Sequence, residues 1–488
     1  MNRRVLLIAL SSVAMSASSV ALANCFVPST PNDGYFDQAW GGAGLGCVVF
    51  AGDNRDASKD SYLTKLAVAP KSEILMGGNV YSETWWIGEL TADGSLDATF
   101  GDTDSSGRIT GCELHKPSTC PSEANYEFLP QPDNRILIVS DSYLTRTNAG
   151  GQALDPSVNG TAAGGGVGYT SSQFQIATPT AYLYSSSGAL ALTSGGKILM
   201  AGTGVDPDAT KGDGYHTPGV ARISTDLSLD IGFNAVKFNN NNDTYAGGVY
   251  VDTGGDSAGH QVLTQSTGKL ILVSSSSGDF RISRLNADGS PDAGFGTNGT
   301  TIIAKAPAPC GNSGNWSSIL YHAAILDRAD RIYVTSECST GLPATAVIRL
   351  TADGAIDATY VNSTFAACPD QVRPHALAVD GAGRILVGGT CENQFGVQRL
   401  RGDNGMLTLD TSFGVAGTGM AHGTFDPTSN FDEVDAMTFD AAGHLFIGGQ
   451  TRPGGTTYRS AVARLTYDLI YTSDFESTPR GCLPPNCN

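Results

Sequence analysis

The sequence predicts an all-β protein, a seven-bladed β-propeller. A strand–turn–strand segment recurs seven times along the 488 residues. Each copy consists of short apolar runs bounded by Gly, Asp, Asn and Ser, which is typical of strands and hairpins, and shows no helical period. The strands are apolar on both faces in places, so each copy must pack against its neighbours. Small sheets arranged radially meet this need and protect most strand edges.

The seven copies align without gaps through their first hairpin. The first apolar residue of the second strand marks each copy: Ile74, Ile136, Ile198, Leu270, Ile332, Ile385 and Leu445. The mean spacing of these markers is about 62 residues. A fixed period of this size indicates a repeat architecture rather than independent domains.

Most copies end in a tail of Asp, a second Asp four residues on, and an aromatic residue three further. The tails are Asp93/Asp97/Phe100, Asp226/Asp230/Phe233, Asp288/Asp292/Phe295, Asp353/Asp357/Tyr360 and the shorter Asp410/Phe413. The same spacing occurs at Asp33-Gly34, Asp37 and Trp40-Gly41, before the first complete copy, and the seventh copy lacks it. We therefore expect the N-terminal segment to complete the last blade. The alternative is an open β-solenoid of the same repeats, which needs no complementary ends.

The fourth copy carries the repeat most clearly. Residues 268–273 read GKLILV and residues 284–296 read RLNADGSPDAGFG. These segments resemble the unit of the delta-60 repeat family of bacterial secreted proteins. The resemblance covers roughly residues 33–465, and it is poor in the second copy, where Asn148-Ala149-Gly150 replaces the D-G turn. It implies a β-propeller-like fold and an extracytoplasmic location, and it implies no agreed activity.

The N-terminus has the features of a secretory signal peptide. Arg3 and Arg4 precede an apolar run, and Ala-Leu-Ala ends at Ala23, so we expect cleavage after Ala23. The run is too short and too rich in serine for a membrane span, and no later segment is more apolar. We predict a signal peptide (1–23), a propeller (24–470) and a Cys/Pro-rich tail (471–488), in an exported monomer.

The formal net charge of −18 argues against nucleic acid or an anionic membrane as a partner. It suits a solvated extracellular surface and cation binding equally. Residues 164–166 are three glycines, but no Lys-Ser/Thr and helix follow them, so we expect no nucleotide cofactor.

All ten cysteines lie after the signal peptide, and an even number in an exported chain predicts disulfides. Two of the predicted pairs join equivalent positions in the fifth and sixth copies. Two others join cysteines close together in the sequence, and the last pair follows because only two cysteines then remain. The predicted pairs are Cys310–Cys338, Cys368–Cys391, Cys112–Cys120, Cys482–Cys487 and Cys25–Cys47.

Residues 102–113, DTDSSGRITGCE, fit a calcium loop of the EF-hand type. Oxygen donors stand at positions one, three and five, glycine at six, and a carboxylate at twelve. The candidate ligands are Asp102, Asp104, Ser106, Ile109 and Glu113. Position five is serine and no helix flanks the loop, so the alternative is an ordinary inter-blade loop.

A second candidate site comes from the alignment itself. The residues ten positions before the markers are Thr64, Tyr126, Gly188, His260, His322, His375 and Asp435. If this strand is innermost, the three histidines and the carboxylate ring the central channel. Such a set could bind zinc or another transition metal, or supply general acid–base groups. The alternative is that repeat descent alone placed histidine there.

Two functions from different classes fit these observations. The first is a binding scaffold for a surface protein or glycan, with calcium as a possible stabilising ion. The second is a metal-dependent lyase or hydrolase that uses His260, His322, His375 and Asp435. Residues 255–259 match the G-x-S-x-G pattern, but a strand follows where a nucleophile elbow requires a helix. Fold alone does not choose between scaffold and enzyme.

Overall fold

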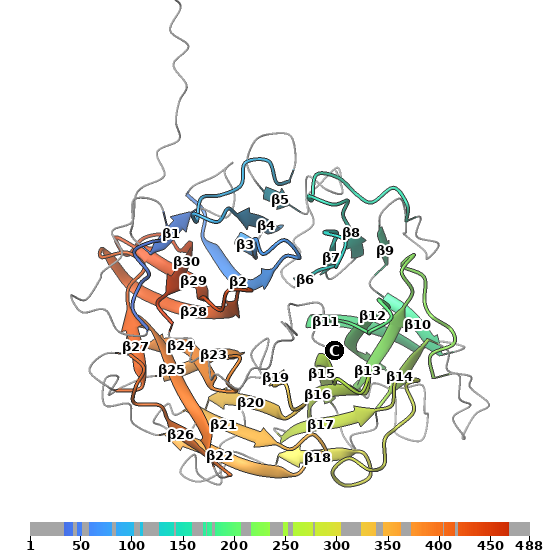
Figure 1. Cartoon of the computed structure of the whole chain (residues 1–488). Coiled ribbons are helices and arrows are strands. Elements are labelled where there is room, and N and C mark those ends of the chain that lie inside the picture. Colours follow the sequence, from blue (N-terminus) through green and yellow to red (C-terminus); the bar gives the residue numbers. More distant parts are fainter. Residues whose placement is uncertain are drawn as a thin grey trace, which may run out of the picture.

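The computed structural model is a closed ring of seven small antiparallel sheets (Figure 1). It describes residues 34–41, 46–50, 58–80, 84–101, 108–110, 126–140, 143–158, 169–171, 173–177, 181–205, 216–234, 247–251, 257–276, 279–303, 324–337, 345–362, 372–403, 405–414 and 418–467. Every regular element in these ranges is a strand, which confirms the predicted seven-bladed propeller. The same ranges contain no helix long and apolar enough to cross a membrane.

The first four blades follow the chain in order. Blade 1 contains β2 (Ser61–Val68), β3 (Ile74–Val80), β4 (Thr84–Leu90) and β5 (Arg108–Thr110). Blade 2 contains β6 (Tyr126–Pro130), β7 (Ile136–Ser140), β8 (Tyr143–Arg146) and β9 (Tyr169–Ser171). Blade 3 contains β10 (Gln173–Ala177), β11 (Ala181–Leu192), β12 (Ile198–Val205), β13 (His216–Ile223) and β14 (Gly248–Tyr250). Blade 4 contains β15 (Ser257–Thr264), β16 (Leu270–Ser276), β17 (Asp279–Leu285) and β18 (Thr300–Ile303).

The last three blades complete the ring. Blade 5 contains β19 (Ala324–Leu326), β20 (Ile332–Glu337), β21 (Thr345–Leu350) and β22 (Ile356–Asn362). Blade 6 contains β23 (Val372–Val379), β24 (Ile385–Cys391), β25 (Gln394–Asp403), β26 (Met406–Leu409) and β27 (Met420–Gly423), the last two both pairing with β25. Blade 7 contains β28 (Ser429–Phe439), β29 (Leu445–Pro453) and β30 (Arg459–Leu465), with β1 (Cys47–Phe50) from the N-terminal region as its fourth strand.

The ring closes through the N-terminal segment. Strand β1 pairs antiparallel with β30, from Cys47↔Ala463 to Phe50↔Ser460. Upstream of it, the Gly34 amide donates to the Thr466 carbonyl at 2.7 Å. A strand from one end of the chain thus completes a sheet made by the other end, which leaves no open end to cap. The predicted closure is confirmed over the open solenoid.

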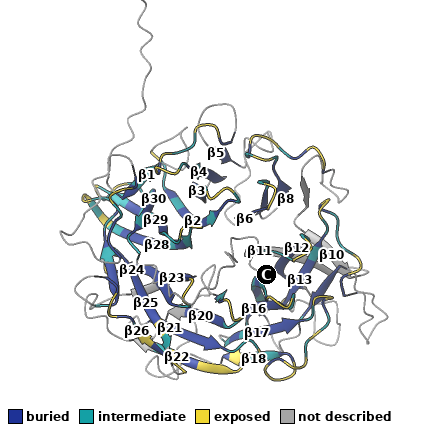
Figure 2. Ribbon diagram, viewed as in Figure 1, coloured by how far each residue is buried: buried dark blue, intermediate teal, exposed yellow. Residues whose placement is uncertain are grey.

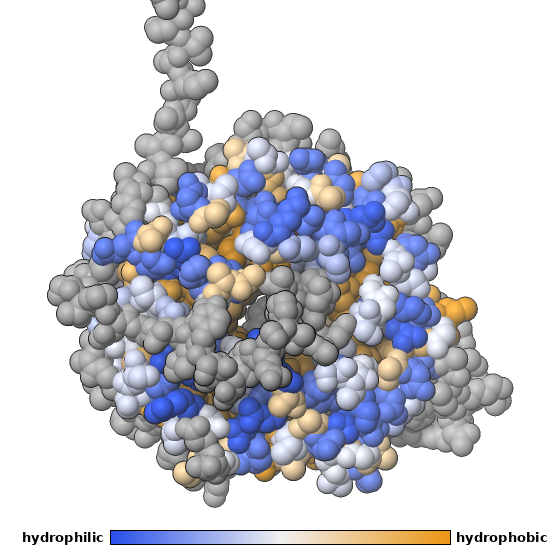
Figure 3. Space-filling model, in the orientation of Figure 1, coloured by the Kyte–Doolittle hydropathy of each residue, from blue (hydrophilic) through white to orange (hydrophobic). Residues whose placement is uncertain are grey.

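The hydrophobic core lies between the blades (Figure 2). The two faces of β4 show this, because both Trp85 and Trp86 are fully buried. Trp86 packs in a cluster with Phe446 of blade 7, and Trp85 packs in a cluster with Phe128 of blade 2. Burial of each such side chain contributes about 1.5–3 kcal/mol, so neighbouring blades stabilise each other. The outer face in Figure 3 is largely polar, with apolar residues visible deeper between the blades.

A repeated ion pair, here called the arginine clasp, explains the conserved tail of the repeat. In blades 2 to 7, an arginine near the end of the third strand of the hairpin unit donates its Nε hydrogen to an aspartate of the tail at 2.7–2.8 Å. The pairs are Arg146–Asp155, Arg222–Asp230, Arg284–Asp292, Arg349–Asp357, Arg399–Asp410 and Arg464–Asp37. The last pair uses the N-terminal segment, so the clasp also holds the ring closed.

In blades 2 to 4 the clasp arginine also donates to a backbone carbonyl of the next blade. The Arg284 guanidinium lies 4.9 Å from the Phe295 ring centroid, and its Nη1 donates to the Ala352 carbonyl of blade 5 at 2.6 Å. The aromatic ring in turn packs below the D-G turn of the following blade. At Gly354, with φ of +86°, an added Cβ would lie 2.7 Å from the Phe295 ring, so both the backbone and the packing require glycine there.

Candidate functional site

The aligned candidate residues that the structure describes lie on the first strand of their hairpins. Figure 1 shows these strands, among them β2, β6, β15, β23 and β28, at the edge of each sheet that faces the ring centre. In four blades the pairing with the second strand shifts by one residue at the aligned position. The extra residues are Thr64, His260, His375 and Asp435. A one-residue bulge of this kind redirects a side chain out of the regular alternation.

Paired glycines in the second strand accompany the bulge in three of these blades. Gly448 and Gly449 of β29 pair with the residues on either side of Asp435. An added Cβ at Gly449 would overlap the Glu433 carbonyl oxygen. Glycine in a strand interior commonly marks such a close backbone approach, and it is what allows the bulge to form here.

The bulges of blades 6 and 7 bring three side chains together. His375 on β23 lies between Glu433 and Asp435 on β28. Its Nε2 is 2.6 Å from Glu433 Oε1, and its Nδ1 is 3.4 Å from Asp435 Oδ1. One ligand atom from each of the three residues lies within 4.8 Å of the others. We call these residues the channel triad.

Neighbouring side chains fix Glu433 in the channel triad. Gln450 donates its Nε2 hydrogen to Glu433 Oε2 at 2.7 Å, and the Thr390 hydroxyl donates to Oε1 at 3.3 Å. Glu433 Oε1 also lies 2.6 Å from His375 Nε2, so a protonated His375 forms an ion pair with Glu433.

The charges in the triad depend on each other. Burial disfavours the imidazolium of His375, but the hydrogen bonds and charges of Asp435 and Glu433 outweigh it and raise the pKa of His375 to about 10. Burial and the charge of Glu433 raise the pKa of Asp435 to about 7. Burial opposes ionisation of Glu433 too, but the contact with His375 holds the pKa of Glu433 below its usual value. A bound cation would take over the role of the imidazolium proton.

The donor set of the triad fits a divalent metal ion. One imidazole nitrogen and two carboxylate oxygens suit zinc, iron or manganese. A metal held by these three residues would have a coordination position left for water or a ligand, as in catalytic zinc sites. Gln450 and Thr390 would then act as outer partners that orient Glu433.

The other aligned residues behave differently. His260 lies on β15 of blade 4 and its Nε2 is 2.8 Å from the Ser275 hydroxyl. Burial lowers the pKa of His260 to about 4, so this imidazole is neutral near pH 7, and it does not belong to the channel triad. Thr64 and Tyr126 contact each other through their hydroxyl oxygens at 3.2 Å. His322 lies outside the described residues, and Gly188 on β11 offers no side chain.

Sequence reasoning did not find Glu433. Glu433 stands two residues before Asp435, and the bulge at Asp435 interrupts the regular alternation that would have told which face each side chain takes. Aligning one position of the repeat ignored this neighbour. The alignment placed His375 and Asp435 at one position of the repeat, and the structure brings His375 Nδ1 to 3.4 Å from Asp435 Oδ1.

The remaining site predictions fall largely outside the described residues. Ile109 of the predicted calcium loop lies on β5 with a buried side chain in the core between blades 1 and 2, and Asp102, Asp104, Ser106 and Glu113 are not described. Cys47 and Cys391 are disulfide-bonded. The residues predicted to pair with them, Cys25 and Cys368, and the other six cysteines are not described, so the pairings stay predictions.

One family model matches a part of blade 4 and the start of its tail. Residues 265–295 match the family model described as "Domain of unknown function (DUF5122) beta-propeller". No curated protein matches the chain. Among solved structures, a virginiamycin B lyase from Staphylococcus aureus is 11% identical with a TM-score of 0.44, covering 86% of this chain and 98% of that one.

Two further structures are similarly distant. The NanB sialidase from Streptococcus pneumoniae is 10% identical with a TM-score of 0.37, covering 84% of this chain and 69% of the sialidase. A GH74 xyloglucanase from Xanthomonas campestris is 12% identical with a TM-score of 0.40, covering 82% of this chain and 52% of the xyloglucanase. These likenesses carry no argument about activity.

Proposed function

We propose that this chain is an exported propeller of the delta-60 type that binds a divalent metal ion at the channel triad and holds a surface protein or glycan there. The observation that carries the proposal is the convergence of His375, Glu433 and Asp435 from two blades, with a ligand atom of each within 4.8 Å of the others. A metal with an open position binds hydroxyl or carboxylate oxygens of a ligand. The proposal includes cleavage of a signal peptide after Ala23 and export of the mature chain. It also includes a stabilising calcium ion bound by the loop of residues 102–113.

Metal analysis of the purified full chain tests this function. After incubation with zinc or manganese and removal of free ion, we expect about one metal per chain, measured by mass spectrometry of the elements. His375→Ala should lose it. His260→Ala is the matched control, because it removes the histidine from the same repeat position in blade 4 and should keep the metal.

Two results would contradict the proposal. One is the absence of bound metal in the wild-type chain under these conditions. The other is equal metal content in the wild type and in His375→Ala. Circular dichroism of each variant checks that the fold is retained.

The second candidate is a metal-dependent lyase or hydrolase at the same place. The open coordination position favours it, since a metal can polarise a substrate oxygen or activate water. A screen of the metal-loaded chain against glycans and esters distinguishes the two. Turnover lost in His375→Ala and kept in His260→Ala supports the enzyme, and binding without turnover supports the scaffold.

A further inference from the structure

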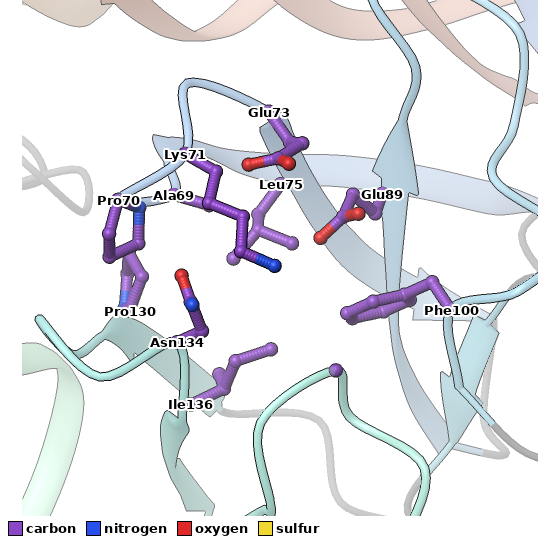
Figure 4. Close-up of a pocket in the computed structure, with 11 residues that line it drawn as sticks. Ala69, Pro70, Lys71, Glu73, Leu75, Glu89, Phe100, Pro130, Asn134 and Ile136 are labelled. Atoms are coloured by element: carbon purple, nitrogen blue, oxygen red, sulfur yellow. The ribbon is translucent and has the colours of Figure 1, made fainter.

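A cavity of ≈ 60 Å³ lies between the turns of blades 1 and 2 (Figure 4). Glu73, Glu89 and Phe100 line it from blade 1, and Asn134 and Ile136 line it from blade 2. A single water needs only about 10–15 Å³ by a comparable measure. The cavity therefore has room for a small head group, such as the four heavy atoms of a guanidinium.

The backbone shows that this cavity lies where the other blades have the arginine clasp. The Asp97 amide donates to the Glu89 carbonyl at 2.8 Å, and in blade 4 the equivalent bond runs from Asp292 to Arg284 at 3.1 Å. Glu89 thus replaces the clasp arginine. Blade 1 is the exception among seven blades, because blades 2 to 7 all have arginine there.

A second cation of the clasp is replaced in the same way. In blade 4, Lys269 precedes the second strand and pairs with Asp292 at 2.7 Å. Glu73 occupies this position in blade 1, since the turn bond to its carbonyl from Ala69 corresponds to the bond from Gln265 to the Lys269 carbonyl. Two carboxylates therefore stand where blade 4 has a guanidinium and an ammonium.

The partners of a guanidinium are nevertheless kept in blade 1. Asp97 accepts its usual bonds from Thr99 through Oδ1, at 2.8 and 2.7 Å. Phe100 is buried in the place of Phe295. The carbonyl of Ala149 corresponds to that of Ala352, and within the described residues no donor reaches it.

The charge at the cavity is correspondingly unbalanced. Burial, the charges of Glu73 and Asp97 and a side-chain hydrogen bond with Asp97 raise the pKa of Glu89 to about 7, and the charge of Lys71 acts in the opposite direction. Lys71 is exposed but also lines the cavity, and Figure 4 shows its ammonium pointing into it towards Glu89. A ligand cation would therefore displace this tethered ammonium. A cation placed in the cavity would relieve this repulsion.

We propose that the cavity binds the guanidinium group of a ligand, which supplies from outside the cation that Arg284 and its counterparts supply in the other blades. The guanidinium lies over Phe100, pairs with Glu89 and Asp97, and donates to the Ala149 carbonyl. Such a combination of carboxylate pairing and ring stacking favours guanidinium over ammonium. The source is either an arginine of a partner protein or a free guanidine compound.

Titration calorimetry with the full chain tests the proposal. The probe is N-acetyl-arginine amide, and its uncharged isostere N-acetyl-citrulline amide is the matched ligand control. We expect saturable binding of the arginine compound and at least about tenfold weaker binding of the citrulline compound. Equal affinities, or no saturation with either up to about 10 mM, would overturn the proposal.

Three variants locate the site. Glu89→Gln should weaken arginine binding at least about tenfold, whereas Asp353→Asn, an exposed acid in blade 5, should leave it unchanged. Glu89→Arg should abolish binding and raise the melting temperature, because the chain then supplies its own clasp. Unchanged binding in Glu89→Gln contradicts the site even if Glu89→Arg does not fold.

Two further binding measurements complete the test: the pH dependence of arginine binding and the affinity for an arginine-containing peptide. Binding to the wild type should strengthen as pH rises through about 7, where Glu89 ionises. A pH-independent affinity between pH 5 and 8 would overturn the role of Glu89. Tighter binding of a Gly-Gly-Arg-Gly-Gly peptide than of agmatine assigns a protein partner, and the reverse order assigns a free guanidine.

Discussion

The arginine clasp and the channel-side bulge make opposite use of the same repeat. The clasp has the same Arg–Asp chemistry in six of seven blades, and its departures lie in blade 1. The aligned position carries threonine, tyrosine, glycine, histidine or aspartate in different described blades, and it forms a bulge at Thr64, His260, His375 and Asp435. The clasp position keeps its arginine because that residue stabilises the ring. The channel-side position varies while its backbone stays similar, so its side chain is free to carry function.

Blade 1 shows that the clasp can be lost without loss of the blade. It keeps the aspartate, the aromatic ring and the turn of the clasp but reverses the charge at Glu73 and Glu89. The blade still packs, because the core between blades 7, 1 and 2 buries both Trp85 and Trp86. The core therefore tolerates loss of one clasp, and the exposed consequence is a cavity with unbalanced charge.

The largest effect should come from breaking a buried clasp. Arg399 is 1% exposed and its partner Asp410 is 2% exposed. Arg399→Met leaves a buried carboxylate without its cation, so we expect the free energy of unfolding to fall by about 3–5 kcal/mol. Denaturation in urea measures it.

The matched control for this change is Arg401→Met. Arg401 also approaches Asp410, at 3.4 Å, but is 47% exposed, so its removal should cost no more than about 1 kcal/mol. Similar losses in both variants would show that the clasp owes its stability to charge alone and not to burial.

The histidine of the bulge in blade 4 should affect stability through pH. Burial lowers the pKa of His260 from 6.5 to about 4, so the unfolded chain binds this proton more readily than the folded chain. The stability that His260 contributes is present above pH 6.5 and is lost as pH falls towards 4. The shift corresponds to about 3 kcal/mol at most.

Urea denaturation of the wild type and of His260→Gln, each at pH 7 and pH 4.5, measures the contribution of His260 to the pH dependence of the free energy of unfolding. The variant should lose less stability on acidification than the wild type. Parallel losses in the two proteins would mean that His260 is not buried as a neutral imidazole.

A matched pair of glycines should separate backbone strain from packing at the clasp. Gly289 and Gly268 both have positive φ, +91° and +78°. An added Cβ at Gly289 would lie 2.8 Å from the Phe233 ring, whereas at Gly268 the nearest atom is 3.9 Å away. We expect Gly289→Ala to cost about 1–3 kcal/mol more than Gly268→Ala in thermal or urea unfolding. Equal costs would contradict the packing of ring below turn.

The smallest effect should come from the rim of the clasp. Arg284 Nη1 pairs with Asp353 Oδ1 at 3.0 Å, but Asp353 is 80% exposed. Asp353→Asn should change the free energy of unfolding by no more than about 0.5 kcal/mol. A larger loss would show that the exposed ion pair between Arg284 and Asp353 also stabilises the fold.

The sequence alone determined the repeat, the seven blades and the closure by the N-terminal segment. These follow from local rules, because D-G turns, alternating apolar runs and the Asp–Asp–aromatic tail each fix backbone geometry over a few residues. It also placed His375 and Asp435 at one position of the repeat, and the structure brings these two side chains together.

Only the tertiary structure decided the chemistry at these positions. His260 and His375 occupy the same place in the repeat, yet Ser275 accompanies one and two carboxylates the other. Which blades stand side by side at the channel, and which side chains a bulge redirects, depend on long-range packing. The same holds for the cavity at Glu89, which exists because a cation present in six blades is absent from one.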